Sequence, residues 1–354
     1  MTSRRPVRRL ALAGASARLA YALMTRRPPG GEKTWTRTNH RGEPVTLLEG
    51  PAVTAAAVTA ALAVPGLDAS ERVALALAGA GAGALGCYDD LLGSGDRRGL
   101  RGHLGALAKG EVTTGAVKIV GIGVAGLAAS LLLSRRGPAS DDGGLAGRAS
   151  ESAAGRVVDV AINAGLIAGS ANLLNLFDLR PGRAIKVSAL ASVALALAGP
   201  RARAASAAPA GAAIALLPED LGERAMLGDC GANAVGAMLG TAAAASLSRP
   251  ARLGVFAVVT GLTLASEKVS FTKVIERTPA LRWADMLGRR PPTAAPAGEP
   301  ASMAGQAPQP PTLASAAPAP RHVPASAPTS SPGDAAKTSA VAPQAPATET
   351  PRPL

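Results

Sequence analysis

Four aspartates stand at the ends of apolar segments in this chain, in positions where carboxylates can do chemistry. Asp89 and Asp90 follow the apolar run 73–85, and Asp178 and Asp229 occupy similar positions in the motifs NLFDLRPG and MLGDCGAN. Acidic side chains are costly in hydrocarbon, so acids at the mouths of membrane helices indicate a functional site. Because helices that alternate in direction bring all four to one membrane face, we predict a metal-dependent active site at the membrane surface.

The aspartate pair lies in the motif GCYDDLLGSGD, where two carboxylates follow one another along a helix. Neighbouring side chains on a helix point in different directions, so one acid can meet a metal or a base while the other serves another partner. Mg²⁺ prefers hard oxygen ligands, commonly one or two carboxylates together with substrate phosphates. A solvated helix end with both acids exposed is the alternative for this motif taken alone.

A second polar motif, ANLLNLFDLRPG, places Asn172, Asn175 and Asp178 at every third position, on one face of a helix end. On a helix otherwise made of Leu and Ala, these groups must face a polar cavity or a partner helix. Arg180 and two further basic residues follow, and a basic turn beside acids suits a pyrophosphate held with a divalent cation. Hydrogen bonds between helices are the alternative for the asparagines. Phe177 is equally suited to interfacial anchoring and to stacking on a nucleobase.

The motif MLGDCGANAVGAMLG places Asp229 between glycines at the start of an apolar segment. Amide groups at a helix N-terminus favour anions, and Gly228 and Gly231 allow a phosphate to approach the backbone closely. Capping of the helix by Asp229 is the alternative, and both roles are open to it. Lys118 stands just inside another apolar segment, where it either extends to the membrane surface or reaches an anionic substrate.

The elements that must position these residues are apolar segments of helical length. The chain is 47% hydrophobic and 17% charged, with a mean hydropathy of +0.21, which is typical of a polytopic membrane protein. We expect an all-α fold, an integral membrane bundle of about nine to ten transmembrane helices, within residues 1–290. Residues 291–354 are rich in Pro and Ala and predict a disordered tail. The apolar segments are 8–24, 51–66, 72–88, 114–134, 157–177, 184–199, 203–217, 231–247 and 251–267.

The charge distribution favours a membrane over a nucleic acid as the partner. The net charge is +13, but the basic residues fall in short loops between apolar segments, where they suit anionic lipid headgroups and phosphorylated substrates. The Lys and Arg residues favour a cytoplasmic face for the four aspartates, although the arginines at the N-terminus oppose this orientation. We therefore expect a multi-pass protein of the cytoplasmic membrane. Two cysteines, Cys87 and Cys230, are too few for a disulfide framework.

Five segments, in order, resemble the polyprenyl-phosphate N-acetylhexosamine-1-phosphate transferase superfamily, glycosyltransferase family 4, which includes phospho-N-acetylmuramoyl-pentapeptide and UDP-N-acetylglucosamine-1-phosphate transferases. They are RTNHRGEPVTLLEGPA, GCYDDLLG, GHLGALAKGEVTTGAVK, NLLNLFDLRPG and MLGDCGAN, within about residues 35–273. The resemblance implies a membrane enzyme that moves a sugar-1-phosphate from a UDP-sugar to a polyprenyl phosphate. It also implies Mg²⁺ as cofactor, UMP as a product, and a place in the biogenesis of cell-wall polymers such as peptidoglycan.

The resemblance implies a role for each residue already singled out. It makes Asp89 and Asp90 the pair that positions or deprotonates the lipid phosphate, adds Asp178 to the catalytic set, and associates Asp229 and Asp89 with the metal. The expected partners are the UDP-sugar, the polyprenyl phosphate, membrane lipids and a second copy of the chain, with no nucleic acid. The residues expected to bind the substrates are Asn172, Asn175, Phe177, Lys118, Arg180 and Asn233.

Two features depart from the family pattern. Residues 267–290, where the family has a His-rich loop, contain no histidine, and the Pro-rich tail stands where a tenth helix is usual. A catalytically silent relative that scaffolds envelope assembly is therefore one alternative, which the retention of all four aspartates opposes. A secondary transporter is another, but its acids should lie near the membrane midplane on broken helices. Release of UMP distinguishes the enzyme from both.

Overall fold

The computed structural model describes residues 4–93, 102, 105, 108–135 and 153–291. The chain divides into a helical unit, Met1–Thr293, and a second unit, Ala294–Leu354, which lies outside the described residues. The disordered tail predicted for residues 291–354 therefore stays a prediction.

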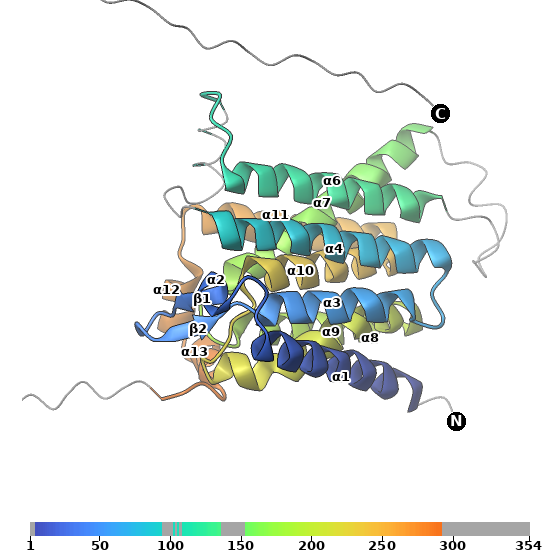
Figure 1. Cartoon of the computed structure of the whole chain (residues 1–354). Coiled ribbons are helices and arrows are strands. Elements are labelled where there is room, and N and C mark those ends of the chain that lie inside the picture. Colours follow the sequence, from blue (N-terminus) through green and yellow to red (C-terminus); the bar gives the residue numbers. More distant parts are fainter. Residues whose placement is uncertain (1–3, 94–101, 103–104, 106–107, 136–152, 292–354) are drawn as a thin grey trace, which may run out of the picture. The chain divides into compact units, whose positions relative to one another are not determined.

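Long helices account for most of the helical unit (Figure 1). Each apolar segment expected from the sequence lies largely on one of them, because an apolar run must satisfy its backbone hydrogen bonds internally and a helix does so. The long helices are α1 (Arg4–Arg26), α3 (Glu49–Leu62), α4 (Ala69–Leu92), α6 (Thr114–Ser134), α7 (Ala153–Phe177), α8 (Arg183–Ala198), α9 (Pro200–Leu221), α10 (Gly228–Ser246) and α11 (Arg249–Ser266).

Two helices of the described part of the chain, α6 and α7, are long and apolar enough to cross a membrane. A third candidate is α11 taken together with α12 (Phe271–Arg277), the two being bent by 95° at a short break. These helices indicate a membrane protein, whereas the nine to ten spans expected from the sequence are not shown. Length is one reason: α3 has 14 residues and α8 has 16, and a span needs roughly 20.

The core of the helical unit forms around α10, which packs against α4, α7, α3 and α9. Nearly every side chain of α10 is buried, and most of them are small. Gly236 lies against the backbone of Ser170, and Gly240 lies against the backbone of Leu166 and Ile167, so α10 and α7 approach closely. Close approach through small residues is the usual way in which helices associate in lipid.

The same close approach joins α4 to α10 beside the aspartates. A Cβ atom at Gly86 would collide with the backbone carbonyl of Asp229 and lie 2.8 Å from the amide nitrogen of Cys230. A neighbouring α3 glycine, Gly50, meets the carbonyl of Leu227 in the same way. The beginning of α10 is therefore fixed from two sides by residues that have no side chain.

We expect Gly86→Ala to destabilise the protein by about 1 to 3 kcal/mol, because the added methyl group forces α4 away from α10. The matched control is Gly123→Ala in α6, where a Cβ atom meets nothing within 4 Å. That control should be neutral or stabilising by up to about 1 kcal/mol, since alanine is the better helix former. Thermal unfolding of the two detergent-solubilised variants measures the difference. Equal stability of the two variants would contradict the packing described for Gly86.

Large apolar side chains cover the outward faces of the long helices. Val120 and Val124 on α6 are more than half exposed, as are Leu190 and Leu197 on α8 and Val258 on α11. Water would disfavour so many exposed aliphatic side chains, whereas lipid tails accommodate them without penalty. This pattern supports a membrane environment around the helical unit.

Short elements gather at one end of the helices (Figure 1). The guanidinium group of Arg41, in the turn of a hairpin, donates to the backbone carbonyls of Arg290 and Pro291 at 3.0 Å each. Arg290 in turn donates to the carboxylate of Glu43 at 2.6 Å. These contacts hold the hairpin beside the segment that follows α13. The short elements are α2 (Glu32–Trp35), β1 (Thr36–Thr38), β2 (Pro44–Thr46), α12 (Phe271–Arg277) and α13 (Pro279–Met286), with β1 and β2 antiparallel.

Candidate functional site

Lys118 connects the two aspartate motifs GCYDDLLG and MLGDCGAN. Its ammonium group lies 2.5 Å from Oδ2 of Asp89 and also forms an ion pair with Asp229. The three side chains come from α6, α4 and α10, and each is largely shielded from solvent. Thr113 caps α6 by accepting the amide of Ala116 at 3.1 Å, which fixes the turn that carries Lys118. An anionic ligand could bind the ammonium group of such a cluster, and a metal cation could replace the ammonium group between the two carboxylates.

Asp90 binds the beginning of α10 instead of facing Lys118. Its carboxylate accepts the backbone amides of Asp229 at 3.1 Å and Cys230 at 2.9 Å, and Arg37 donates to its backbone carbonyl. The predicted divergence of the aspartate pair is therefore seen, with Asp89 on the ammonium group and Asp90 on the helix end. The alternative in which Asp229 caps its own helix is not seen, because α10 has no capping bond from a side chain of its own first turn and Asp90 supplies it from α4. A helix N-terminus stabilises such a carboxylate.

Asp178 follows α7 and reaches the same helix end. It is 8% exposed, and its carboxyl group lies beside the backbone amide of Gly228. Burial raises the pKa of Asp178 well above its usual range, and the nearby carboxylates of Asp220 and Asp229 add to the rise. Its Oδ2 atom is buried and has no hydrogen-bond partner among the described residues. A buried oxygen without a protein partner is available to a bound water, ion or ligand.

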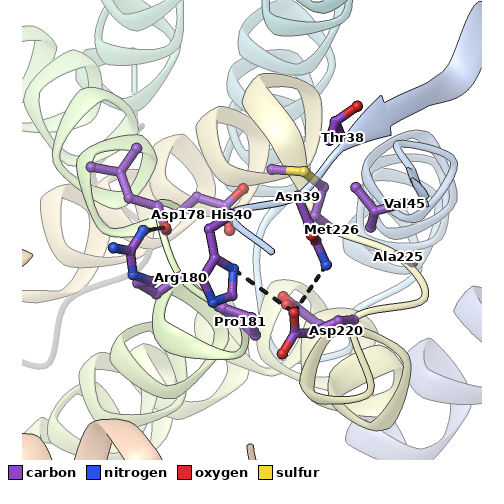
Figure 2. Close-up of a pocket in the computed structure, with 12 residues that line it drawn as sticks. Thr38, Asn39, His40, Val45, Asp178, Arg180, Pro181, Asp220, Ala225 and Met226 are labelled. Atoms are coloured by element: carbon purple, nitrogen blue, oxygen red, sulfur yellow. Dashed lines mark hydrogen bonds and ion pairs between the residues drawn. The ribbon is translucent and has the colours of Figure 1, made fainter. Parts of the chain in front are cut away.

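A pocket of about 220 Å³ opens beside Asp178 (Figure 2). Its walls come from the β1–β2 hairpin, the loop after α7 and the connection between α9 and α10. The lining of the pocket combines apolar surface with several polar side chains, which is the usual composition of a small-molecule site. The lining residues are Thr38, Asn39, His40, Val45, Asp178, Leu179, Arg180, Pro181, Asp220, Glu223, Ala225 and Met226.

Glu223 organises the far wall of this pocket. Its backbone has a positive φ of 57°, which is strained for a residue other than glycine, and its side chain is buried. Asn39 donates to its carboxylate at 3.0 Å, Arg41 lies 2.9 Å away, and Nδ1 of His40 lies 3.8 Å away. Burial lowers the pKa of His40, and the nearby Arg180 lowers it further against the opposing effect of Glu223. Contacts with the hairpin residues that line the pocket therefore stabilise the strained backbone conformation of Glu223.

Asp220 adds another carboxylate to this end of the molecule. Its Oδ1 atom accepts the amide of Gly182 at 2.9 Å, while the buried Oδ2 atom has no hydrogen-bond partner within the described ranges. Neither Asp220, Glu223 nor His40 was predicted as a site residue. The signal for the first two was present, because the sequence PEDLGER follows an apolar segment just as the aspartate motifs do.

The remaining predicted residues lie around the site in different surroundings. Asn233 is 1% exposed in α10, and its Nδ2 atom has no partner among the described residues. Asn172 and Asn175 are half-buried on α7. The ring of Phe177 stacks on Phe271 of α12, with centroids 5.1 Å apart, so in this structure an aromatic partner already covers it. That contact holds the bent α11–α12 segment against the end of α7.

A buried ion-pair network fastens α13 beside the loop that carries Asp178. Arg183, the first residue of α8, donates to Asp285 through Nε at 2.7 Å and through Nη2 at 3.1 Å. Arg289 donates to the same carboxylate at 2.8 Å, and Lys186 donates to the backbone carbonyl of Asp285 at 2.7 Å. Burial alone would raise the pKa of Asp285, but these cations hold it below its usual range. Arg183 and Lys186, which follow Asp178 in the sequence, therefore bind α13.

The carboxylates suit a hard divalent cation by chemistry, although they are not arranged as a complete ligand set. Within the described ranges, no three His, Cys, Asp or Glu side chains converge as metal ligands. Asp89 and Asp229 nevertheless share one cation, the Lys118 ammonium group, and Asp178 presents an orphaned oxygen nearby. Mg²⁺ commonly takes one or two carboxylates and completes its shell with water and substrate phosphates, so two carboxylates are a sufficient protein contribution.

Neither a protein-family model nor a curated protein sequence matches this chain.

Proposed function

We propose that the protein is a Mg²⁺-dependent transferase that moves an N-acetylhexosamine-1-phosphate from a UDP-sugar to a polyprenyl phosphate and releases UMP. The observation that carries this proposal is the ion-paired group of Asp89, Lys118 and Asp229. Three helices contribute one charged side chain each at one end of apolar helices, and a pocket lined by Asp178 opens at the same end. Phosphoryl transfer between a soluble donor and a lipid acceptor needs this combination of charges, at a place that both substrates can reach.

The charged groups have separate tasks in the proposed reaction. The positive charge of the Lys118 ammonium group neutralises phosphate oxygens. Two carboxylates already hold this group in place, so it needs little reorganisation during the reaction. Asp89 orients that ammonium group. As the lipid phosphate attacks, Asp89 can accept the proton of that phosphate, or it can help to hold Mg²⁺. Mg²⁺, held by Asp229 and Asp89, would neutralise the charge of the donor pyrophosphate. Asp90 keeps the start of α10 against α4 through its two amide hydrogen bonds.

The pocket beside Asp178 is the proposed site for the nucleotide of the donor. Its apolar floor, including Val45 and Met226, suits a planar base, and the orphaned carboxylate oxygens of Asp178 and Asp220 suit N–H and O–H donors. Arg180 at the rim suits a phosphate. The end of the molecule with this pocket would face the cytoplasm, where nucleotide sugars are found.

A second cavity is suited to the hydrocarbon chain of the acceptor. It has a volume of about 360 Å³, lies between α7, α8, α10 and α11, and is lined almost entirely by aliphatic side chains such as Leu173, Leu239 and Val259. A prenyl chain can lie in such a cavity because its methyl and methylene groups can pack against the aliphatic walls without burying polar groups.

The proposal is tested by UMP release from the purified full-length protein. The reaction contains undecaprenyl phosphate, Mg²⁺ and, in separate tubes, UDP-N-acetylglucosamine or UDP-N-acetylmuramoyl-pentapeptide. We expect lipid-dependent UMP release from one of the donors and its loss on addition of EDTA, because charge neutralisation by the cation is part of the reaction. Restoration by excess Mg²⁺ separates metal removal from denaturation. UMP release that ignores both the lipid and EDTA would contradict the proposed reaction.

A further inference from the structure

We propose that a cavity at the end of the helices opposite the aspartates binds an anionic glycerophospholipid. The cavity has a volume of about 350 Å³ and lies between the beginning of α1, the end of α3 and the middle of α9. Two arginines line it together with small and aliphatic residues. The lining residues are Arg8, Arg9, Leu12, Ala60, Ala63, Val64, Pro65 and Ala208.

The shortness of α3 creates this cavity. A helix of 14 residues is about 21 Å long at 1.5 Å per residue, less than the roughly 30 Å of a bilayer core. Its neighbours α1 and α9 have 23 and 22 residues and pack closely, with Gly211 against the backbone of Leu10. The chain turns away after Val64 while these two helices continue. A notch therefore remains beyond the end of α3, between α1 and α9.

Within the described part of the chain, no acidic side chain balances the positive charge of the notch, and none pairs with Arg8 or Arg9. The acids at the same end, Asp68 and Glu71, are bound by Arg201 at 3.2 and 2.6 Å. Two guanidinium groups beside apolar walls match the phosphate of a lipid headgroup, which an arginine fork binds with two parallel hydrogen bonds.

The apolar walls select a lipid over a soluble phosphate. Leu12 is 60% exposed, and Leu19 and Leu62 on the adjoining faces of α1 and α3 are also exposed, so an acyl chain entering beside the headgroup would cover them. A headgroup held here also explains how the basic start of α1 can lie on the face opposite the aspartates. The anionic lipid would supply the countercharge that the described residues do not provide. This inference does not depend on the transferase activity.

The experiment compares stabilisation by two lipids with the same acyl chains. Full-length protein in neutral detergent is titrated with phosphatidylglycerol or phosphatidylcholine, and the midpoint of thermal unfolding is followed. We expect phosphatidylglycerol to stabilise the wild type at lower concentration, and Arg8→Gln/Arg9→Gln to weaken that effect about 25-fold, about fivefold for each arginine. The control Arg72→Gln/Arg203→Gln removes two charges from the same end outside the cavity and should respond as the wild type does.

Two further arms keep the test decisive. Ala63→Trp fills the apolar part of the cavity and leaves both arginines in place, so it should also lose the preference for phosphatidylglycerol. Inorganic phosphate at equal concentration should not stabilise the wild type. Equal titrations of the wild type and the double arginine variant would overturn the proposal. So would stabilisation by inorganic phosphate alone, which would show an anion site without a lipid.

Discussion

The substitution Asp229→Asn is expected to reduce UMP release at least about a hundredfold, because removing one preorganised charged group from a transition-state site has an effect of this size. Asparagine keeps the shape of the side chain but removes the charge that pairs with the Lys118 ammonium group. It also removes a hard anionic oxygen from the proposed Mg²⁺ ligands. The same change at Asp89 is expected to have a similar effect, since that carboxylate contacts the same ammonium group at 2.5 Å.

The control for this prediction is Asp159→Asn on α7. Asp159 is also a carboxylate paired with an arginine near a helix end, at 3.0 Å from Nε of Arg249, but it does not contact Lys118. We expect Asp159→Asn to keep UMP release close to the wild-type rate. The assay is run across a range of Mg²⁺ concentrations. A weakened metal site should raise the Mg²⁺ concentration needed for half-maximal UMP release, whereas a lost charge should lower the maximal rate. Wild-type rates for Asp229→Asn and Asp89→Asn would show that the site is wrongly assigned.

The substitution Asp285→Asn is expected to give the largest loss of stability, about 3 to 5 kcal/mol, since removing one partner of a buried ion pair leaves the other charge uncompensated. Arg183 is 4% exposed and donates two hydrogen bonds to this carboxylate. Because α13 is fastened beside the loop of Asp178 through this pair, the nucleotide pocket should be disordered together with it. Thermal unfolding of the detergent-solubilised variant measures the loss of stability.

The pH dependence of the same variant gives an independent check. The carboxylate of Asp285 has a pKa below its usual range in the folded protein, so its contribution is present above the pKa of the unfolded chain. That contribution is lost as the pH falls through the folded-state pKa. The difference between wild type and Asp285→Asn should therefore be large at neutral pH and shrink under acidic conditions. The matched control is Arg290→Gln, which breaks the exposed pair with Glu43 and should change stability far less at any pH.

The sequence predicts the helices and the position of the charged groups for a common reason. Apolar segments mark the helices, and an acid at the end of such a segment is rare enough to draw attention, as at Asp89, Asp178 and Asp229. For Lys118 the sequence leaves two roles open, extension to the membrane surface or binding of an anionic substrate, and in the structure it pairs with two of these acids. The number of membrane spans was harder to predict, because short helices such as α3 resemble spans in composition but not in length.

The partner of each side chain was not predictable, because it depends on contacts between distant segments. Nothing in GCYDDLLG indicates that Asp90 binds amides of α10, a contact across 139 residues of sequence. Likewise, His40 lies in a polar loop without periodicity, and its place at the pocket depends on Glu223 in the loop after α9. The sequence allows two roles for Phe177, and its contact with Phe271 follows from the bend after α11.

The most direct test of the proposed reaction follows the two phosphorus atoms of the donor separately. Purified wild-type protein is given undecaprenyl phosphate, Mg²⁺ and the donor that supports UMP release, labelled in one preparation at the α-phosphate and in another at the β-phosphate. Transfer of a sugar-1-phosphate predicts that the β-label enters the lipid fraction while the α-label remains in water-soluble UMP, in equal amounts. Recovery of both labels in UDP would mean transfer of the sugar alone, and recovery of both in water-soluble products other than UDP would mean hydrolysis. Either result would contradict the proposed reaction.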